Sequence, residues 1–368
     1  MKRTVEESLV LEEIAVEGYE KVVVATDERS GLKAIICIHN ASLGPTLGGT
    51  RIFPYPNFEA ALTDAKRLAR GMTYKSAMAE VGFGGAKSVI ISHPKNKNND
   101  MLMAFAEAVN SLGGLYTCAE DSGCTIQDVT LIGKHTPYVV GLSHEKSSGN
   151  PSHFTAWGTF RGIQAALQAL DGSTSLEGKT VAIQGLGSVG ALLAEHLFWH
   201  GAHLIVSDID WEKTEAMAKK FNAVACPCED ILSVECDVLA PCAMGGIINS
   251  KTIPQLRCRA IAGCANNQLL TDQDGDELKK RGILYAPDFV INAGGLINVS
   301  QELAEEGYNP KTARKKVDKL YDQLMSLFEL AEKKNCSTHH AAVELAEHRI
   351  KHGIGKRETP PRYHHYNG

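Results

Sequence analysis

The chain has 368 residues, of which 43% are apolar and 22% charged, and its formal net charge is -5. A chain of this length forms about two domains, and this composition is typical of globular proteins. The negative balance excludes the basic surface that nucleic-acid binding needs, and no apolar run approaches the roughly 20 residues that cross a bilayer.

The ten cysteines follow no spacing that is typical of a metal site. Only Cys226 and Cys228 are close together, and the sequence contains no CxxC pair. We therefore expect no bound metal. Free thiols are typical of a reducing compartment, so we expect a cytoplasmic protein.

The N-terminal part of the chain predicts a helix, two strands and a loop. Residues 1–20 are acidic and have a helical pattern, which differs from a signal peptide. Strands are predicted at residues 21–25 and 32–39. The glycine-rich stretch 43–51 follows and ends at Arg51. It is either a plain turn or a loop in which the arginine holds a phosphate or carboxylate.

Two lysines twelve residues apart are the strongest candidates for chemistry. Apolar residues recur at helical spacing from the helix cap Asn57 to Met72, and Lys75 is the next position on that face. Lys87 follows two glycines and opens a predicted buried strand at residues 88–91. Burial and mutual repulsion lower the pKa of an ammonium group, which makes a lysine usable as a base near neutral pH. The alternative is that both stems lie along the surface with their ammonium groups in water.

An acidic residue, Asp121, follows the next predicted strand. A helix at residues 99–112 leads to that strand at 115–119, and Asp121 stands just beyond it, before a glycine. A carboxylate at this place could compensate the charge of the two lysines and carry protons. The alternative is that Asp121 caps a helix predicted at residues 125–131.

A polar stretch at residues 143–153 marks the predicted domain boundary. We expect a first domain over residues 1–145, completed by residues 336–368, and a second domain over residues 146–335. Amphipathic helices are predicted at residues 155–170, 313–334 and 338–351. The first turn of the first of these could face an anion. The last needs a cover for its apolar face, so we expect it to pack on the first domain.

The second domain begins with a nucleotide-binding pattern. A predicted strand at residues 179–184 runs into the glycine-rich loop 185–190, and after a helix a second strand at residues 203–207 ends at Asp208. This acid lies 18 residues beyond the last glycine, as in a dinucleotide fingerprint. Asp208 can bind both ribose hydroxyls and would repel a 2'-phosphate, so NAD is favoured over NADP. The alternative is a glycine-rich turn that binds no nucleotide.

The same alternation of strands and loops continues along the chain. Further strands are predicted at residues 237–240, 259–262 and 284–286. Small or polar loops follow these strands, at the edge where doubly wound sheets bind ligands. In one of these loops Asn267 could contact a nicotinamide or a substrate carboxylate, because its amide donates and accepts. Leu296 and Val299 share a helix face that is either ordinary core or the wall of an apolar pocket.

Several long motifs stand in one order between about residues 22 and 305. They are LGPTLGGTR, RLARGMTYKSAMA, GFGGAKSVII, AEDSGCT, SSGNPSHFTAWG, QGLGSVG, SDID, DVLAPCAMGG, AIAGCANNQL and YAPDFVINAGGLINV. By these motifs the chain resembles the amino acid dehydrogenases of the glutamate, leucine, phenylalanine and valine group, and within that group its leucine-specific members. The resemblance implies an α/β fold of two domains separated by a cleft: an N-terminal α/β substrate domain and a Rossmann-type, doubly wound NAD-binding domain.

The resemblance also implies roles for single residues. Lys87 would be the general base that activates water, and Asp121 would shuttle protons. Lys75 and Asn267 would bind the substrate carboxylate. The implied side-chain pocket consists of Leu47, Gly48, Met72, Ala119, Leu296 and Val299. The implied NAD site consists of Arg51, Ser122, Gly123, Thr155, Gly185, Leu186, Gly187, Ser188, Val189, Gly190, Asp208, Ala243, Met244, Ala265 and Asn266.

The implied activity is the NAD-dependent oxidative deamination of L-leucine, and of valine and isoleucine, to 2-oxo acids with release of ammonia and NADH, together with the reverse reaction. All the pocket positions are apolar or small, so no group there would pair with the side-chain carboxylate of glutamate. Leu47 would crowd a phenyl ring. Leu296 stands where related leucine enzymes carry valine, and the added methylene could shift the preference toward valine.

Two other readings stay open. One is a preference for phenylalanine or valine within the same group, and the other is an NAD-binding protein without catalysis. The partners we expect are a small aliphatic amino acid or oxo acid and ammonia, with no nucleic acid and no membrane. The resemblance further implies a homo-oligomer, in the form of an octamer.

Overall fold

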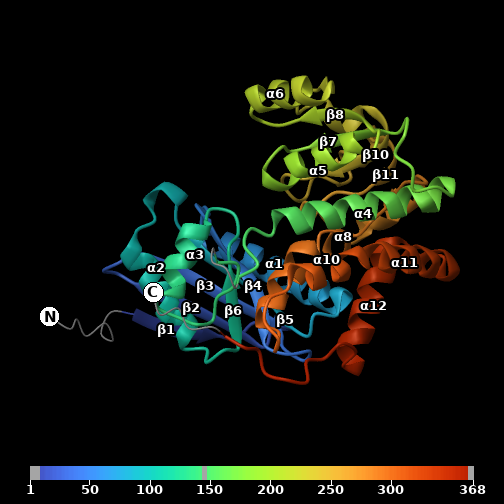
Figure 1. The fold of residues 1–368 in the computed structure, drawn as a ribbon. Helices are drawn as coiled ribbons and strands as arrows, with labels where there is room; N and C mark the ends of the chain where they lie inside the picture. The colour runs from blue at the N-terminus through green and yellow to red at the C-terminus, as the bar shows by residue number, and fades with distance from the viewer. Residues whose placement is uncertain (1–8, 143–146, 364–368) are drawn as a thin grey trace. The chain divides into compact units, whose positions relative to one another are not determined.

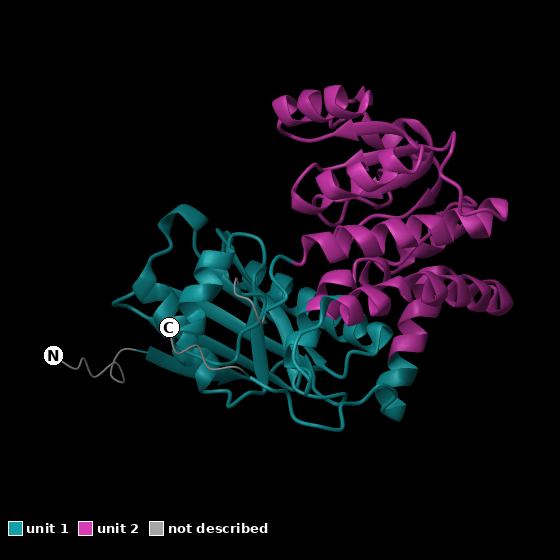
Figure 2. Ribbon diagram, viewed as in Figure 1, with its two compact units in different colours: residues 1–150, 299–310, 347–368 teal, residues 151–298, 311–346 magenta. Residues whose placement is uncertain are grey.

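The computed structural model describes residues 9–142 and 147–363, and the chain divides into two compact units (Figure 2). Unit 1 consists of residues 1–150, 299–310 and 347–368, and unit 2 consists of residues 151–298 and 311–346. The sequence places the boundary after residue 145 and gives all of residues 336–368 to the first domain. Residues 336–346 belong to unit 2 instead, where Thr338 Oγ1 donates to the carbonyl of Tyr285 at 2.6 Å.

Unit 1 is built on a mixed sheet of six strands (Figure 1). In spatial order the strands are β1 (Leu9–Ile14), β2 (Lys21–Asp27), β3 (Leu32–Asn40), β5 (Gly84–Ile91), β4 (Thr46–Phe53) and β6 (Tyr116–Ala119). The pairs from β1 to β5 are antiparallel, whereas β4 pairs parallel with both β5 and β6. The strand β4 therefore lies between β5, which carries Lys87, and the edge strand β6, which leads to Asp121.

Helices cover both faces of this sheet. They are α1 (Phe58–Ala79), α2 (Asn99–Asn110) and α3 (Ile126–Gly133). Alternate side chains of a strand point to opposite faces. On β5, Ala86 and Ile90 pack with α2 and α3, whereas Val89 packs with α1. Lys87 stands two residues before Val89, so it faces α1.

Two expectations for unit 1 are wrong. Residues 9–14 form the strand β1 and no helix, because they pair antiparallel with β2 from Leu9 to Ile14, and such pairing overrides a local helical pattern. Residues 1–8 lie outside the described residues. The stretch 43–51 is no loop from Thr46 onward, since it forms the buried strand β4. A Cβ at Gly48 would lie 1.8 Å from the carbonyl of Ala86, so glycine is needed for this close approach of two strands.

The helix α1 begins as predicted. The side chain of Asn57 caps it by accepting a hydrogen bond from the backbone amide of Ala60 at 2.8 Å. The predicted packing of the last helix on unit 1 is also present at its C-terminal end. There Arg349 Nη1 donates to the carbonyls of Ala77 and Met78 at 3.1 and 2.8 Å.

Unit 2 has a parallel sheet with the strand order of a doubly wound nucleotide fold. In spatial order the strands are β12 (Leu284–Tyr285), β11 (Arg257–Ile261), β10 (Glu235–Pro241), β7 (Thr180–Gln184), β8 (His203–Ser207) and β9 (Val224–Ala225). All neighbouring strands pair parallel. The order reverses between β7 and β10, which is where such sheets bind ligands. The predicted Rossmann-type fold is confirmed.

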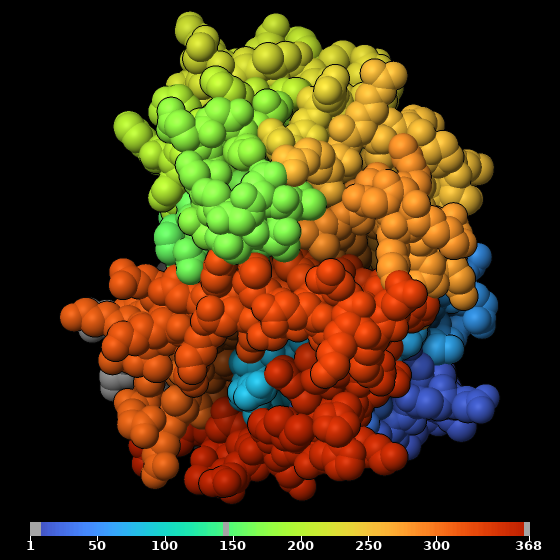
Figure 3. Space-filling view, turned by 90° about the vertical axis from the view of Figure 1, so that its right-hand side faces the viewer, coloured from blue at the N-terminus to red at the C-terminus, as the bar shows by residue number. Residues whose placement is uncertain are grey.

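The remaining helices belong to unit 2 or cross between the units. They are α4 (Ser152–Asp171), α5 (Ser188–Trp199), α6 (Trp211–Phe221), α7 (Gln273–Lys280), α8 (Asp288–Ile291), α9 (Gly294–Ser300), α10 (Pro310–Asp318), α11 (Leu320–Lys334) and α12 (Thr338–His352). Short 3-10 turns lie at Pro94–Asn96, Ile231–Ser233, Ile253–Gln255 and Gln301–Leu303. The C-terminal helices, in orange and red, reach the molecular surface (Figure 3). Among the described residues, no helix has the length and apolar character that would let it cross a membrane.

Candidate active site

Lys87 is almost fully buried on the α1 side of β5, with 3% of the residue exposed. Its ammonium group contacts Oδ2 of Asp121. Burial lowers the pKa of Lys87, and the charge of Asp121 opposes that effect. The ammonium therefore loses its proton more readily than that of a lysine in water, as a general base requires.

Asp121 reaches Lys87 across the strand that separates them. It stands two residues beyond β6, and β4 lies between β6 and β5. The carboxylate passes over Gly49 of β4, where a Cβ would lie 2.9 Å from Asp121 Cβ and 2.8 Å from the carbonyl of Glu120. Any side chain at this position would push Asp121 away from Lys87. Gly49 is a functional residue that our sequence analysis missed.

Two further groups hold the carboxylate of Asp121. Arg51 Nε lies 3.3 Å from Oδ1, and the backbone amide of Ser122 donates to the same oxygen at 2.6 Å. Burial alone would raise the pKa of Asp121, but the positive charges of Lys87 and Arg51 outweigh burial and hold this pKa well below its usual range. Asp121 is therefore ionised at neutral pH. It does not cap α3, because the cap of that helix is Thr125.

Arg51 is itself held by a second carboxylate. Its Nη1 lies 2.8 Å from Oδ2 of Asp64 on α1, and the hydroxyl of Tyr55 donates to the same oxygen at 2.5 Å. The sequence predicts Arg51 as a cofactor contact, and the structure brings it to Asp121.

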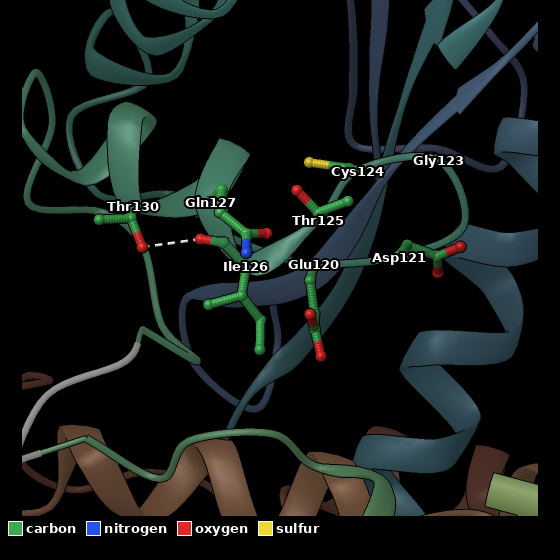
Figure 4. A pocket seen from close by; sticks show the side chains of 8 residues that line it. All are labelled: Glu120, Asp121, Gly123, Cys124, Thr125, Ile126, Gln127 and Thr130. Carbon is green, nitrogen blue, oxygen red and sulfur yellow. Dashed lines mark hydrogen bonds between the residues drawn. The ribbon is translucent and has the colours of Figure 1, made fainter. Parts of the chain in front are cut away.

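A pocket of about 750 Å³ lies beside Asp121 (Figure 4). It is lined by Glu120, Asp121, Gly123, Cys124, Thr125, Ile126, Gln127 and Thr130. The side chains of Glu120 and Asp121 point in different directions in this view. Burial, followed by the charge of Asp121, raises the pKa of Glu120. A ligand in this pocket would therefore meet two acids of unequal acidity.

The turn of α1 that carries Met72 and Lys75 packs against β5 beside Lys87. A Cβ at Gly85 would lie 2.0 Å from the backbone nitrogen of Thr73, so the helix touches the strand directly at this glycine. Gly85 and Lys87 are two residues apart and share one face of β5. Lys75 itself is half-buried.

Three of the remaining predicted pocket residues, Leu47, Gly48 and Ala119, lie on the neighbouring strands β4 and β6. Leu47 is buried on β4, and Ala119 at the end of β6 lies opposite Gly49. Val299 is buried near the end of α9 in unit 1, whereas Leu296, on the same helix, belongs to unit 2.

The glycine-rich loop 185–190 of unit 2 fits a dinucleotide. Gly185 has a positive φ of 95°, and a Cβ there would lie 2.7 Å from that of Ala243. At Gly190 a Cβ would lie 2.0 Å from the carbonyl of Gly185, so this glycine permits the close packing of helix and loop. At Gly187 no atom lies within 4 Å of a Cβ, so a side chain would enter open space. Gly187 is also the cap of α5 and offers no side chain, which leaves the helix N-terminus available to a phosphate.

Asp208 ties the end of β8 to this loop. Its Oδ2 accepts a hydrogen bond from the backbone amide of Leu186 at 2.7 Å, and its Oδ1 accepts from that of Asp210 at 3.0 Å. The carboxylate thus has a fixed place beside the glycine-rich loop. Ser188 and Val189 form the first turn of α5.

The loops after β10 and β11 meet at the same edge of the sheet. A Cβ at Gly245 would lie 2.4 Å from the carbonyl of Asn266, and Gly246 donates to the carbonyl of Asn267 at 2.7 Å. Asn267 adopts a positive φ of 51°. Met244 is 68% exposed. This edge therefore gathers Ala243, Met244, Ala265, Asn266 and Asn267 beside the switch point.

Thr155 lies in the first turn of α4. Its hydroxyl donates to the carbonyl of Pro151 at 3.1 Å, and a Cβ at Gly295 would lie 2.6 Å from it. The predicted cofactor residues thus form two groups. Arg51, Ser122 and Gly123 belong to unit 1, and all the others belong to unit 2. In the described part of the chain, no cluster of three or more His, Cys, Asp or Glu residues could hold a metal ion.

Comparison with known proteins connects both groups of residues with one family. Residues 16–138 match the family described as "Glu/Leu/Phe/Val dehydrogenase, dimerisation domain", and residues 209–356 match "Glutamate/Leucine/Phenylalanine/Valine dehydrogenase". The chain is 51% identical to the leucine dehydrogenase of Geobacillus stearothermophilus, over 90% of this chain and 91% of that protein. It is 46% identical to the phenylalanine dehydrogenase of Caldalkalibacillus thermarum, over 90% and 91%. The crystal structure of L-tryptophan dehydrogenase from Nostoc punctiforme is similar with a TM-score of 0.77 and 46% identity, over 91% of this chain and 96% of that one.

Proposed function

Because the chain belongs to the Glu/Leu/Phe/Val dehydrogenase family and is an amino acid dehydrogenase, we propose that it deaminates branched-chain L-amino acids with NAD. The contact between buried Lys87 and ionised Asp121 carries this proposal. Two features of the fold support it. One is a buried lysine, which could serve as the base, and the other is the edge of a doubly wound sheet, where such sheets bind nucleotides.

The chemistry follows from the state of the Lys87–Asp121 pair. NAD, when bound, would supply the acceptor for the hydride that leaves Cα of the substrate. The resulting iminium carbon is attacked by water, and neutral Lys87 removes a proton from that water as its oxygen bonds to carbon. Burial favours the neutral form of Lys87, and Asp121, in contact with Nζ, can receive the proton and return it to the departing nitrogen. Cleavage of the C–N bond, with transfer of the hydroxyl proton of the intermediate to neutral Lys87, then releases ammonia and the 2-oxo acid. We assign the substrate carboxylate to Lys75 and Asn267.

The cofactor proposal depends on Asp208 and Gly187. The carboxylate of Asp208 can accept hydrogen bonds from both hydroxyls of the adenosine ribose, and it would repel a 2'-phosphate. The open space beside Gly187 and the uncapped start of α5 suit a pyrophosphate. These features support NAD over NADP.

The substrate proposal depends on a pocket without charge. The six pocket residues assigned by resemblance are all apolar or small, and burying the second carboxylate of glutamate among them without a partner would be costly. Buried Leu47 and Leu296 leave less room than glycine or alanine would. These features support leucine, valine or isoleucine. Relatives that act on phenylalanine and tryptophan make an aromatic substrate the second candidate.

A single assay tests the proposal. The purified protein is incubated with NAD and, separately, with L-leucine, L-valine, L-isoleucine, L-phenylalanine, L-tryptophan and L-glutamate, and NADH absorbance is followed. We expect the highest kcat/KM among the first three. Higher values for phenylalanine or tryptophan would contradict the substrate class, and parallel runs with NADP test the cofactor. We also propose a homo-oligomer, in keeping with the dimerisation domain matched by residues 16–138. Light scattering tests this, with eight chain masses as the expected result.

A further inference from the structure

A chain of polar contacts leads from Lys87 to a carboxylate outside the predicted site, Asp64. We propose that Asp64 is a positioning residue: it holds the Arg51 guanidinium against Asp121 and thereby fixes the carboxylate that contacts Lys87. This inference rests on the proposed function, because it assigns Asp64 to the same proton-transfer pair. It gives Arg51 a role in the chemistry that differs from the cofactor contact expected from the sequence.

The geometry of Arg51 supports this role. Arg51 uses separate nitrogens for its two partners, with Nη1 at 2.8 Å from Asp64 Oδ2 and Nε at 3.3 Å from Asp121 Oδ1. Only 19% of the Arg51 side chain is exposed. A planar guanidinium fixed at one edge has a fixed direction at the other. Asp64 therefore decides where Nε points.

Asp64 is held in turn by Tyr55, just beyond the end of β4. The hydroxyl of Tyr55 donates to the oxygen of Asp64 that also receives Arg51, at 2.5 Å. Burial, together with this hydrogen bond, raises the pKa of Tyr55, so its hydroxyl keeps its proton and stays a donor. The sequence of contacts runs from Tyr55 through Asp64, Arg51 and Asp121 to Lys87. An exposed ion pair would have a small effect on its surroundings, but this series ends at a lysine that is 3% exposed.

Charge balance gives Asp64 an effect on Lys87 that a purely structural residue would lack. Several groups act on this ammonium. Burial lowers the pKa of Lys87, Asp121 raises it, Arg51 lowers it and Asp64 raises it. Asp121 in turn lies near the carboxyl group of Glu120 and the thiol of Cys124, and burial raises the pKa of both groups. The negative charge of Asp64 thus offsets the effect of Arg51 on the pKa of Lys87. Without the charge of Asp64, Arg51 lowers that pKa unopposed by Asp64.

The experiment compares two carboxylates on one helix. Asp64→Asn keeps the size of the side chain and removes its charge, and Asp64→Glu keeps the charge. Glu80→Gln is the matched control, because Glu80 at the C-terminal cap of α1 also pairs with an arginine of unit 1, Arg349, at 3.0 Å. At 1.5 Å per residue it lies roughly 24 Å from Asp64 along the helix axis.

Two measurements are made on each variant. The first is the pH profile of kcat/KM for leucine deamination, whose acid limb reports the free base. The second needs no substrate: carbamylation of Lys87 by cyanate, followed by peptide mass spectrometry over a range of pH. For Asp64→Asn we expect both midpoints to move to lower pH by roughly 0.5 to 1 unit. We also expect kcat to fall by roughly tenfold, since Asp121 is less well placed. Asp64→Glu should recover most of the shift, and Glu80→Gln should match the unchanged protein.

The outcomes separate this inference from the proposed function. If Asp64→Asn leaves both midpoints unchanged, Asp64 does not act on the pair and the inference is wrong. A higher KM for NAD with an unchanged acid limb would likewise overturn it and return Arg51 to a cofactor role. If the unchanged protein oxidises no amino acid, the proposed function fails, while the cyanate midpoint still decides the role of Asp64. Should Asp64→Asn not fold, Tyr55→Phe, which loosens Asp64 and keeps its charge, must lower kcat while the cyanate midpoint stays in place.

Discussion

The two groups of predicted site residues, one in each unit, are built in different ways. In unit 1 the functional groups are side-chain charges, with Lys87, Asp121 and Arg51 in direct contact. In unit 2 the site consists mostly of backbone, with glycines and an uncapped helix start beside a single acid, Asp208. The first group depends on a balance between buried charges. The second depends on the open space that its glycines leave beside the loop. We therefore expect the site residues of unit 1 to be sensitive to the loss or displacement of a charge, and those of unit 2 to the gain of a carbon atom.

Removing the base gives the largest expected effect. Lys87→Ala deletes the group that we propose takes a proton from water, and it leaves the negative charge of Asp121 with one cation fewer. We expect turnover of leucine to fall by about 10³-fold or more. NAD binding, measured by calorimetry, should stay within about twofold of the unchanged protein, because most of the residues proposed to bind NAD belong to unit 2. Lys21→Ala, which breaks the surface pair with Glu13, serves as a control. Activity that survives in Lys87→Ala would show that Lys87 is not the base. A loss of NAD binding would show that Lys87 also contributes to the cofactor site.

Adding one carbon to unit 1 tests the same pair through space. In Gly49→Ala the new Cβ would lie 2.9 Å from Asp121 Cβ, so the carboxylate has to move away from Lys87. We expect a loss of about 10²-fold in kcat, with unchanged affinity for NAD. The cyanate midpoint of Lys87 should also fall, since its counter-charge is farther away. Near-normal kcat would mean that the position of Asp121 over Gly49 has no part in the reaction.

Gly49 also illustrates what the sequence could and could not predict. The fingerprint around residues 179–208 depends on neighbours in the chain, and its strands and helix agree with the prediction to within about one residue at the strand ends. Gly49 matters only because β6 pairs beside it, with Ala119 opposite. Arg51 and Tyr55 meet Asp64 only because α1, which carries Asp64, packs against the sheet. Such contacts depend on pairing between segments far apart in the chain. Strand pairing of this kind also explains why residues 9–14 and 46–51 form strands, where the sequence predicts a helix and a loop.

Two glycines of one loop test the role of space in unit 2. At Gly187 an added Cβ meets no atom within 4 Å, so Gly187→Ala should cost the fold about 1 kcal/mol or less. The methyl group would occupy the place proposed for the pyrophosphate, and we expect the Kd for NAD to rise roughly 30-fold, or about 2 kcal/mol. Gly190→Ala puts a Cβ 2.0 Å from the carbonyl of Gly185, so it should weaken NAD binding and also lower Tm. Unchanged NAD binding in Gly187→Ala would remove this loop from the cofactor site.

The single acid of unit 2 has a smaller expected effect. Asp208→Asn keeps an oxygen that can accept the hydrogen bond from Leu186 and removes the charge that would repel a 2'-phosphate. We expect the ratio of kcat/KM for NADP to that for NAD to rise by about tenfold, or about 1.4 kcal/mol. Leucine KM should stay constant. An unchanged ratio would mean that the preference for NAD comes from another residue.

An acid outside both sites gives the smallest expected effect and tests whether burial is the cause of the difference between the units. Asp171 accepts hydrogen bonds from Arg259 and Lys179, and these bonds lower the pKa of Asp171 to about 2. A lowered carboxyl pKa stabilises the fold above the unfolded value of about 4, and this stabilisation is lost as the pH falls from about 4 to about 2. Asp171→Asn should therefore reduce the free energy of unfolding at pH 7 by about 1 kcal/mol or less, because 43% of the Arg259 side chain is exposed and salt screens the pair. Urea unfolding at pH 7 and at pH 3, with and without 1 M NaCl, measures this. A loss of unfolding free energy at pH 7 that persists in 1 M NaCl, or a change in kcat, would contradict this. Either result would show that a carboxylate between two cations has a large effect even at an exposed position. The larger effect expected at Asp121 could then not be attributed to its burial.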